Sequence, residues 1–176
     1  MECRLPEPKL SLENAVRAHL PMLYRVAKRM TRNATAAEDL VGQVLFKVAR
    51  AWDSFEGTHY GNWMVAILRN EFLQANRLKE RRPMETTLED NLSHGEDIVS
   101  SETLRGVEQN LLYEGIATLP EDFRWVLVLC DIEEMNYQDV SESLQIPVGT
   151  VSSRLFRARK MLRNFLLQNG MWETPN

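Results

Sequence analysis

The stretch that decides the fold of this chain spans residues 137–160 and reads YQDVSESLQIPVGTVSSRLFRARK. Asn136 is placed to cap a short helix that ends near Leu144. Pro147 then interrupts the chain, because proline cannot continue a helix that is already under way. A long basic helix is predicted to follow over about 149–167. A short helix, a tight turn and a long basic helix together predict a helix-turn-helix.

The second helix of this motif carries residue types that read DNA. Residues 150–163 hold five basic side chains and no acid, and the second helix of a helix-turn-helix enters the major groove. Small polar residues suit base edges, arginines reach guanine acceptors, and the later basic residues suit phosphates. The predicted DNA-binding residues are Thr150, Ser152, Ser153, Arg154, Arg157 and Lys160. An amphipathic helix with a solvated basic face is the alternative, but the unbroken positive run directly after a turn favours DNA binding.

Helical periodicity extends over nearly the whole chain, and no stretch alternates with the period of a strand. Apolar residues at steps of three or four predict a first helix over 12–30, with Ser11 as its N-cap. A second helix is predicted to begin at Thr35, because Thr35 and Glu38 have the spacing of a capping box. A third helix is predicted over about 62–79. The predicted fold class is therefore all-α.

Charge is strongly segregated along the chain, although its net value over 176 residues is only −4. Residues 1–82 hold 14 basic and 9 acidic side chains, whereas residues 83–122 hold one basic and 10 acidic side chains. Proline, glycine and serine are also concentrated over 82–103, as in linkers. We therefore predict two small helical domains, 1–82 and 107–176, joined by a flexible acidic linker over 83–106. Basic faces on both sides of an acidic connector suggest nucleic-acid binding.

Composition and spacing exclude several classes of protein. The longest apolar run, Trp125–Cys130, has six residues, whereas a transmembrane helix needs about 20. The chain opens without a charged-then-apolar leader, so we expect a cytoplasmic protein without membrane insertion. The two cysteines and three histidines lack disulfide or metal-ligand spacing, so neither metal nor cofactor is expected. Neighbouring acids such as Asp131 and Glu133 point different ways on a helix, so we assign no catalytic residues and expect no enzyme.

The predicted third helix combines basic residues along its length with aromatic residues at its entrance. Phe55, Tyr60 and Trp63 lie at the entrance, and Arg69 and Arg77 lie further along. This interleaving suits single-stranded nucleic acid, because bases stack on rings while cations follow the backbone. For Trp63 the alternative is core packing, which we expect to be its primary role.

The helix-turn-helix stretch resembles region four of the bacterial extracytoplasmic-function (ECF, group four) sigma factors of the sigma-70 family. The resemblance rests on PVGTVSSRLFRAR over 147–159, close to a signature of that family, and on LPEDFR over 119–124. It implies that the long basic helix reads the −35 promoter element. The chain departs from the family at Gln145, where the turn usually carries glycine. A residue other than glycine with positive φ costs about 1 kcal/mol there, so we expect a slightly strained turn.

The N-terminal part resembles region two of the same family, over about 12–82. AEDLVGQVLF at 37–46, followed by Lys47 and Trp52, resembles the helix that docks on the β′ clamp of core RNA polymerase. The resemblance assigns core-polymerase binding to Glu38, Asp39, Gln43, Phe46 and Lys47. The chain has Gly42-Gln43 where the family usually has Gln-Glu, which removes one carboxylate and places a glycine in a helix at about 1 kcal/mol.

Residues 55–82 resemble the segment that opens and reads the −10 element. The resemblance implies that the loop 57–62 captures a flipped-out base of the non-template strand, at a cost of a few kcal/mol that binding must offset. The implied −10 contacts are Tyr60, Asn62, Trp63, Asn70, Asn76 and Arg77. The loop before Trp63 is one residue shorter than is typical, so the base preference of the family is not carried over.

The resemblance as a whole implies a promoter-specificity subunit that binds core RNA polymerase, at its β′ clamp and β flap, and promoter DNA. It also implies an anti-sigma factor that hides both domains, and a linker that threads toward the RNA exit path and orders only on binding. Two weak DNA sites on one tether gain from each other only when polymerase fixes their spacing, so free protein should bind promoter DNA poorly. A polymerase-independent helix-turn-helix regulator is the alternative, although it leaves the N-terminal basic helix without a role and no dimer helix is evident.

Overall fold

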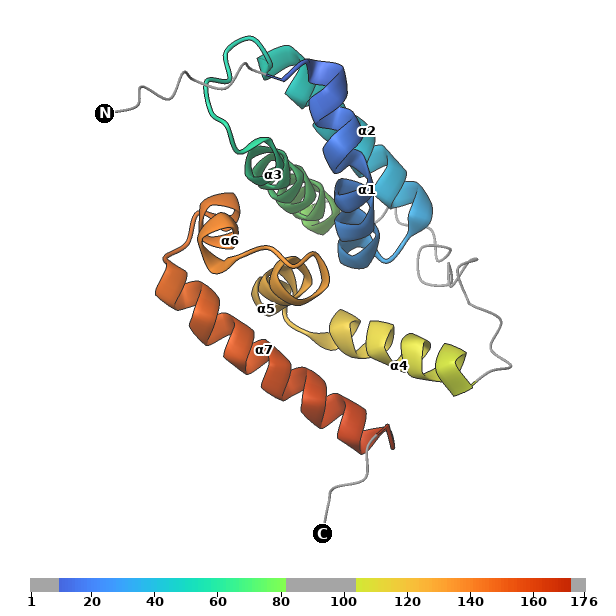
Figure 1. Ribbon diagram of the computed structural model, residues 1–176. Helices are drawn as coiled ribbons and strands as arrows, with labels where there is room; N and C mark the ends of the chain where they lie inside the picture. The colour runs from blue at the N-terminus through green and yellow to red at the C-terminus, as the bar shows by residue number, and fades with distance from the viewer. Residues whose placement is uncertain (1–9, 82–103, 172–176) are drawn as a thin grey trace.

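The computed structural model describes residues 10–81 and 104–171, with side chains from 108 onward in the second range. The helices are α1 (Leu12–Thr31), α2 (Ala34–Ala51), α3 (Tyr60–Arg81), α4 (Leu104–Thr118), α5 (Glu121–Leu127), α6 (Tyr137–Leu144) and α7 (Val148–Gln168), with a π-helical turn at Val128–Ile132 (Figure 1). These two ranges contain no strand, and the predicted all-α fold is confirmed. Most of the predicted acidic linker falls outside the described residues. Of the helices described, none has the length and apolar character needed to cross a bilayer.

Polar caps set where the N-terminal helices begin. The Ser11 hydroxyl accepts a hydrogen bond from the Asn14 amide at 3.3 Å, which confirms the predicted N-cap of α1. The Asn33 side chain accepts one from the Ala36 amide at 2.8 Å and caps α2. The capping box predicted at Thr35 is therefore wrong, because Asn33 lies two residues earlier and asparagine is the better N-cap.

The C-terminal helices are punctuated by proline and by a π-helical turn. Pro120 separates α4 from α5, as expected for a residue that cannot continue a helix, and two acids in the first turn of α5 complement its dipole. The π-helical turn continues α5 and carries Cys130. Burial raises the pKa of the Cys130 thiol to about 11. A thiol with so little thiolate at neutral pH is a poor nucleophile and acts as a packing group.

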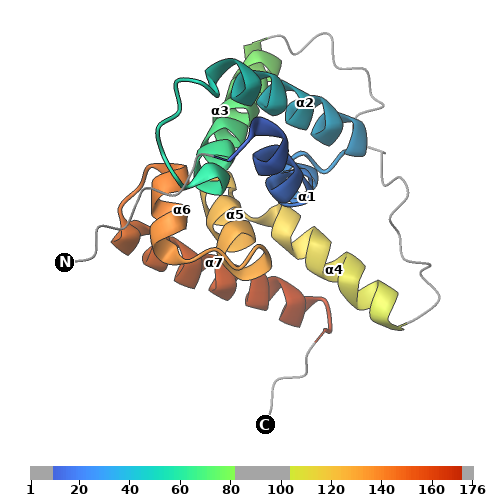
Figure 2. The ribbon, with the colours of Figure 1, turned by 45° about the horizontal axis from the view of Figure 1, so that its top comes forward.

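The helices form an N-terminal unit (α1–α3) and a C-terminal unit (α4–α7) that share one hydrophobic core. Figures 1 and 2 both show α6 beside the N-terminal end of α3, with α1 and α2 on the other side of α3. Trp125 is 1% exposed and meets the Phe72 ring edge-on across the boundary, with ring centroids 5.7 Å apart. The free chain therefore holds its two helical units closed against each other.

The turn between α6 and α7 is closed by Gln145, which has φ 54° and ψ 45° in the left-handed region. The Gln145 amide donates to the Glu142 carbonyl at 3.3 Å, and the Ile146 amide donates to the Ser141 carbonyl at 3.1 Å. The Ser141 hydroxyl also donates to the Ile146 carbonyl at 2.6 Å. The positive φ predicted for Gln145 is thus confirmed, and three hydrogen bonds hold the turn against that strain.

We expect Gln145→Gly to stabilise the protein by about 0.5–1 kcal/mol, because glycine adopts positive φ without a Cβ clash. The measurement is the urea unfolding midpoint of the full chain. Gln138→Gly is the matched control, since Gln138 lies within α6 with helical backbone, and there glycine should destabilise by a similar amount. Destabilisation by both substitutions would show that the turn carries no strain.

Candidate functional site

The exposed face of α2 gathers all the residues predicted to bind core polymerase. A shallow depression is lined by Glu38, Asp39, Gly42, Gln43, Phe46, Lys47 and Glu71. Phe46 projects from its rim with 62% of its surface exposed, and the Arg50 guanidinium lies 5.6 Å from its ring centroid. Lys47 forms an ion pair with the largely buried Glu71 of α3. The depression therefore combines an exposed aromatic ring with fixed charges of both signs.

Gly42, one of the departures from the family pattern, is among the residues that line this depression. A Cβ built at this position meets nothing within 4 Å, so no packing requires glycine here. The helix tolerates Gly42 because the buried residues of α2, among them Val41 and Val44, hold it against the core.

Four aromatic residues pack together where the loop after α2 enters α3. Phe55 stacks on Trp63 with ring centroids 4.2 Å apart, and Trp52 stacks on Tyr60 at 5.3 Å. Tyr60 is buried, and its hydroxyl accepts a hydrogen bond from the Leu10 amide at 3.1 Å. Trp63 is half-buried and packs against the hydrophobic core. The cluster fixes the shape of the loop that is predicted to capture a flipped base.

The predicted −10 residues along α3 divide between solvent and the C-terminal unit. Asn70 and Arg77 are exposed. The Asn76 side-chain amide donates to a Glu121 carboxylate oxygen at 3.3 Å. Asn62 donates in the same way to acids of α6, described below. Two of the six predicted −10 residues are therefore hydrogen-bonded to carboxylates of the C-terminal unit in the closed arrangement.

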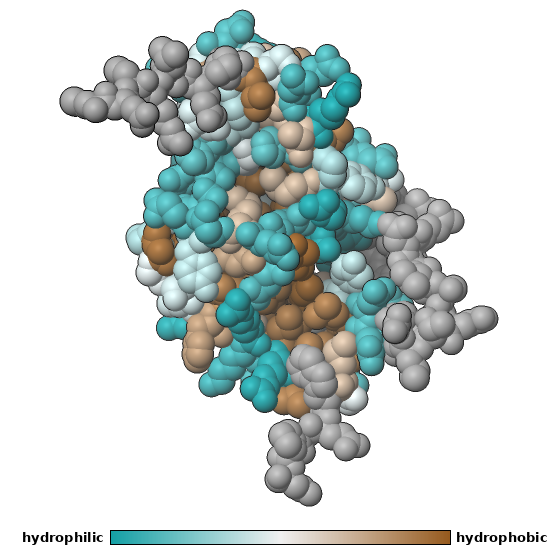
Figure 3. Space-filling view, in the orientation of Figure 1, coloured by the Kyte–Doolittle hydropathy of each residue, from teal (hydrophilic) through white to brown (hydrophobic). Residues whose placement is uncertain are grey.

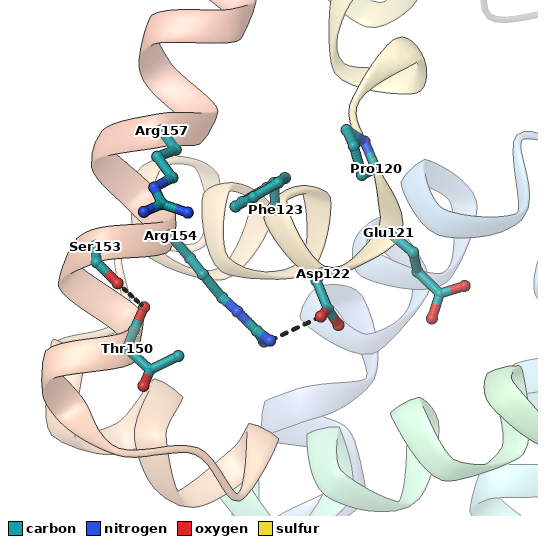
Figure 4. A pocket seen from close by; sticks show the side chains of 8 residues that line it. All are labelled: Pro120, Glu121, Asp122, Phe123, Thr150, Ser153, Arg154 and Arg157. Carbon is teal, nitrogen blue, oxygen red and sulfur yellow. Dashed lines mark hydrogen bonds and ion pairs between the residues drawn. The ribbon is translucent and has the colours of Figure 1, made fainter.

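Four of the six residues predicted to bind the −35 element line one groove between α5 and α7. The lining residues are Pro120, Glu121, Asp122, Phe123, Thr150, Ser153, Arg154 and Arg157 (Figure 4). Arg154 donates to an Asp122 oxygen at 2.7 Å, so it ties α7 to α5. Arg157 is exposed, and none of the ion pairs within the described residues involves it or Lys160. Ser152 and Lys160 lie on α7 outside the groove and are exposed.

Two further residues of α7 lie close to the predicted DNA contacts and have surroundings that the sequence did not indicate. Arg159, which suits a phosphate contact by its position, makes a bidentate pair with Asp131 at 2.6 and 2.9 Å. The Asp131 hydrogen bonds raise the pKa of the Arg159 guanidinium. Phe156 was not predicted as a site residue, yet it is 72% exposed on the same basic helix. An exposed phenylalanine on a DNA-reading helix can contact a thymine methyl group.

Helices α4 and α7 approach closely and leave an apolar surface between them. A Cβ at Gly115 would lie 2.6 Å from a Leu162 methyl carbon and 2.8 Å from the Phe165 ring, so any larger residue there would force these side chains to shift. Figure 3 shows brown, apolar surface in this region of the C-terminal unit. Leu112 of α4 and Met161 of α7 are among the exposed large apolar residues.

The most extensive polar contact between the two units centres on Glu133, which sequence reasoning did not single out for this role. Its side chain is 1% exposed and accepts hydrogen bonds from Arg25 of α1 at 2.5 and 3.2 Å. Arg29 lies 3.5 Å away on its other side. The hydrogen bonds to Glu133 raise the pKa of Arg25. Glu133 and its exposed neighbour Glu134 look alike in sequence, so only the fold distinguishes them.

Comparison with known proteins identifies both units. The sigma-70 region 2 family model matches residues 15–82, and the sigma-70, region 4 model matches residues 109–162. These two ranges cover the N-terminal unit and most of the C-terminal unit. They also contain all the residues predicted for polymerase and DNA binding.

Relatives with known names agree with these matches. The chain is 32% identical over 166 residues to the ECF RNA polymerase sigma factor SigE of Mycolicibacterium smegmatis, covering 91% of this chain and 63% of that protein. It is 30% identical to the ECF RNA polymerase sigma-E factor of Haemophilus influenzae, covering 80% of each. The sigma factor RpoE of Bartonella quintana, solved with the anti-sigma factor NepR, superposes with a TM-score of 0.75 at 27% identity, covering 88% of this chain and 96% of RpoE. The chain belongs to the extracytoplasmic-function group of the sigma-70 family of RNA polymerase sigma factors.

Proposed function

We propose that this protein binds core RNA polymerase and directs promoter-specific initiation of transcription in the cytoplasm. The observation that carries the proposal is the depression on α2, where the five predicted polymerase contacts meet beside an exposed phenylalanine. Aromatic anchors surrounded by charged groups are typical of protein interfaces, and Phe46 has no such role inside this chain. The β′ clamp is the expected partner of this face. The apolar surface between α4 and α7 suits the second polymerase contact, at the β flap.

The two units bind the two promoter elements. Helix α7 enters the major groove of the −35 element, where Arg157 and Lys160 are free to meet DNA, and Arg154 must exchange Asp122 for DNA. The aromatic cluster at the start of α3 holds the loop that receives a −10 base, and Asn70 and Arg77 face the strand. Proteins of this family act by binding, and the chain performs no catalysis of its own.

The closed arrangement supports poor promoter binding by the free protein. Asn62 and Asn76 hydrogen-bond to carboxylates of the C-terminal unit, so they are not available to a DNA strand until the units separate. Core polymerase binds the two units at separate places, and the free energy of this binding favours the open form. An anti-sigma factor is the expected inhibitor, because the similar sigma factor RpoE is solved in complex with one.

In vitro transcription with purified core polymerase, on a library of genomic promoter fragments, tests the proposal. We expect discrete start sites that are absent without the protein, and their alignment should give the −35 and −10 sequences. The alternative is a polymerase-independent regulator. Absence of new transcripts, together with tight and salt-sensitive duplex binding by the free protein, would establish that alternative instead.

Arg157→Ala should weaken binding of the holoenzyme to its promoter by about 1–3 kcal/mol, roughly 5- to 150-fold, and relax specificity at one −35 position. The measurement is the affinity for a set of single-base −35 variants at fixed salt. Lys160→Ala is the comparison, because loss of a phosphate contact weakens all sequences alike and lowers the salt slope by about one. Unchanged affinity and base preference for Arg157→Ala would remove this residue from the DNA interface.

A further inference from the structure

An imidazole and two carboxylates meet where the N-terminal end of α3 contacts α6. His59 lies one residue before α3, and Asp139 and Glu142 lie three residues apart on one face of α6. One ligand atom from each of these three side chains lies within 4.8 Å of the other two. Figures 1 and 2 place these two elements side by side. The three groups therefore come from both units, and a shared ligand would connect the units.

The two carboxylates converge on a single polar group. The side-chain nitrogen of Asn62 donates to Asp139 Oδ1 at 2.8 Å and to Glu142 Oε2 at 3.1 Å. The other oxygens of these acids accept from the amides of Asn136 and Gln138. Within the part of the chain that the structure describes, neither acid forms an ion pair with a lysine or arginine. Two negative charges thus share one neutral donor, and a cation at this point would offset their repulsion.

The donor set matches one class of cation. One imidazole nitrogen and two carboxylate oxygens are typical ligands of Zn²⁺, and Ni²⁺ and Co²⁺ accept the same donors. Metal–ligand bonds of about 2.1 Å require the three atoms to approach by up to about 1.5 Å, and His59 and Glu142 are exposed enough to move. Rotation of the Asn62 amide would turn its oxygen inward as a fourth ligand, because its nitrogen and oxygen are interchangeable in shape.

We propose that His59, Asp139 and Glu142 form a divalent transition-metal site that ties the N-terminal unit to the C-terminal unit. A metal bound to both units stabilises the closed arrangement, because the open form lacks a complete ligand set. The ion would also hold Asn62, a predicted −10 residue, against α6. Metal binding itself does not depend on the proposed function, whereas its effect on promoter binding does. The ligands lie about 80 residues apart in sequence, which is why their spacing did not indicate a metal site.

Zinc binding to the full chain tests the site directly. The protein, without a polyhistidine tag, is titrated at about pH 7.5 against a chromophoric zinc chelator, since imidazole must be unprotonated to bind metal. We expect one Zn²⁺ per chain, and a Kd at least about tenfold weaker for His59→Ala and for Glu142→Gln. Glu114→Gln, which removes an exposed carboxylate of α4, is the matched control and should bind like the unaltered protein.

Hydrogen exchange in the same samples tests closure. Some amides of residues 60–65 exchange only when the two units open. At a zinc concentration about 100 times Kd, this exchange should slow by up to about a hundredfold. Glu142→Gln should lose this protection. Equal zinc affinity in the unaltered protein, His59→Ala and Glu142→Gln would place the ion elsewhere, for instance on a cysteine, and overturn the proposal. Absence of stoichiometric binding would also overturn it, whatever the outcome of the transcription assay.

Discussion

Phe46→Ala is expected to weaken binding to core RNA polymerase by about 2 kcal/mol or more, roughly thirtyfold in Kd. The ring is 62% exposed, and the Arg50 guanidinium of the same helix lies 5.6 Å from its centroid. Burial of an exposed aromatic ring in a partner's pocket is the strongest single contribution that the α2 depression can make. The fold should be unchanged, because Phe46 contributes little to the core of the free chain.

Phe156→Ala is the matched control for this experiment. Phe156 is also a strongly exposed phenylalanine, but it lies on α7. Its loss should leave the Kd for core polymerase unchanged and alter only promoter binding by the holoenzyme. The affinities are measured by competition with a labelled sigma factor for core polymerase. If both variants compete as well as the unaltered protein does, the α2 depression is not the polymerase contact.

The local structure of this chain was largely predictable from its sequence, because helix signals act over a few residues. Ser11 and Asn136 cap the helices that they were predicted to cap, and Pro120 ends one helix before the next. The positive φ of Gln145 follows from its place in the turn. The one cap assigned wrongly, at Thr35, shows how two nearby signals compete. Asn33 offers the better acceptor and α2 starts there.

The clustering of the α2 residues was also predictable, because residues three or four apart share one face of a helix. Glu38, Asp39, Phe46 and the others meet in one depression for that reason. Contacts between the units were not predictable in the same way. Arg25 and Glu133 are separated by 108 residues, and no local sequence pattern around either residue predicts that they pair. The same holds for His59 with its two carboxylates on α6.

Long-range packing also changed the roles of some predicted residues. Tyr60 looks like a stacking platform in sequence, yet the structure buries it beneath Trp52 with its hydroxyl bonded to the Leu10 amide. Arg154 looks like a free base-reading arginine, yet Asp122 holds it. Both remain predicted DNA contacts that need the free protein to rearrange. If the proposed function is correct, the stability of the closed state sets how much free energy polymerase binding must supply to separate the units.

Glu133→Ala is expected to destabilise the closed arrangement by about 3 kcal/mol, roughly a hundredfold in the ratio of closed to open chains. The Glu133 side chain is 1% exposed and accepts hydrogen bonds from Arg25, with Arg29 close by. Removal of the acid leaves the Arg29 guanidinium, only 16% exposed, beside the interface without its counter-charge. Arg25 is half-exposed and can be hydrated after the substitution. The expected destabilisation therefore lies at the lower end of the range for breaking a buried ion pair.

Glu134→Ala provides the control for this prediction, because Glu134 is the exposed neighbour of Glu133 and both substitutions remove one carboxylate. Small-angle X-ray scattering of the full chain should give a larger radius of gyration for Glu133→Ala than for either Glu134→Ala or the unaltered protein. Circular dichroism should show that both variants keep their helices, since Glu133 lies outside the α-helices of the described residues. If Glu133→Ala scatters like its control, the hydrophobic contact between Phe72 and Trp125 holds the units closed without the ion pair. Opening by Glu133→Ala would instead show that one buried carboxylate keeps the predicted −10 residues of α3 against the C-terminal unit until a partner separates them.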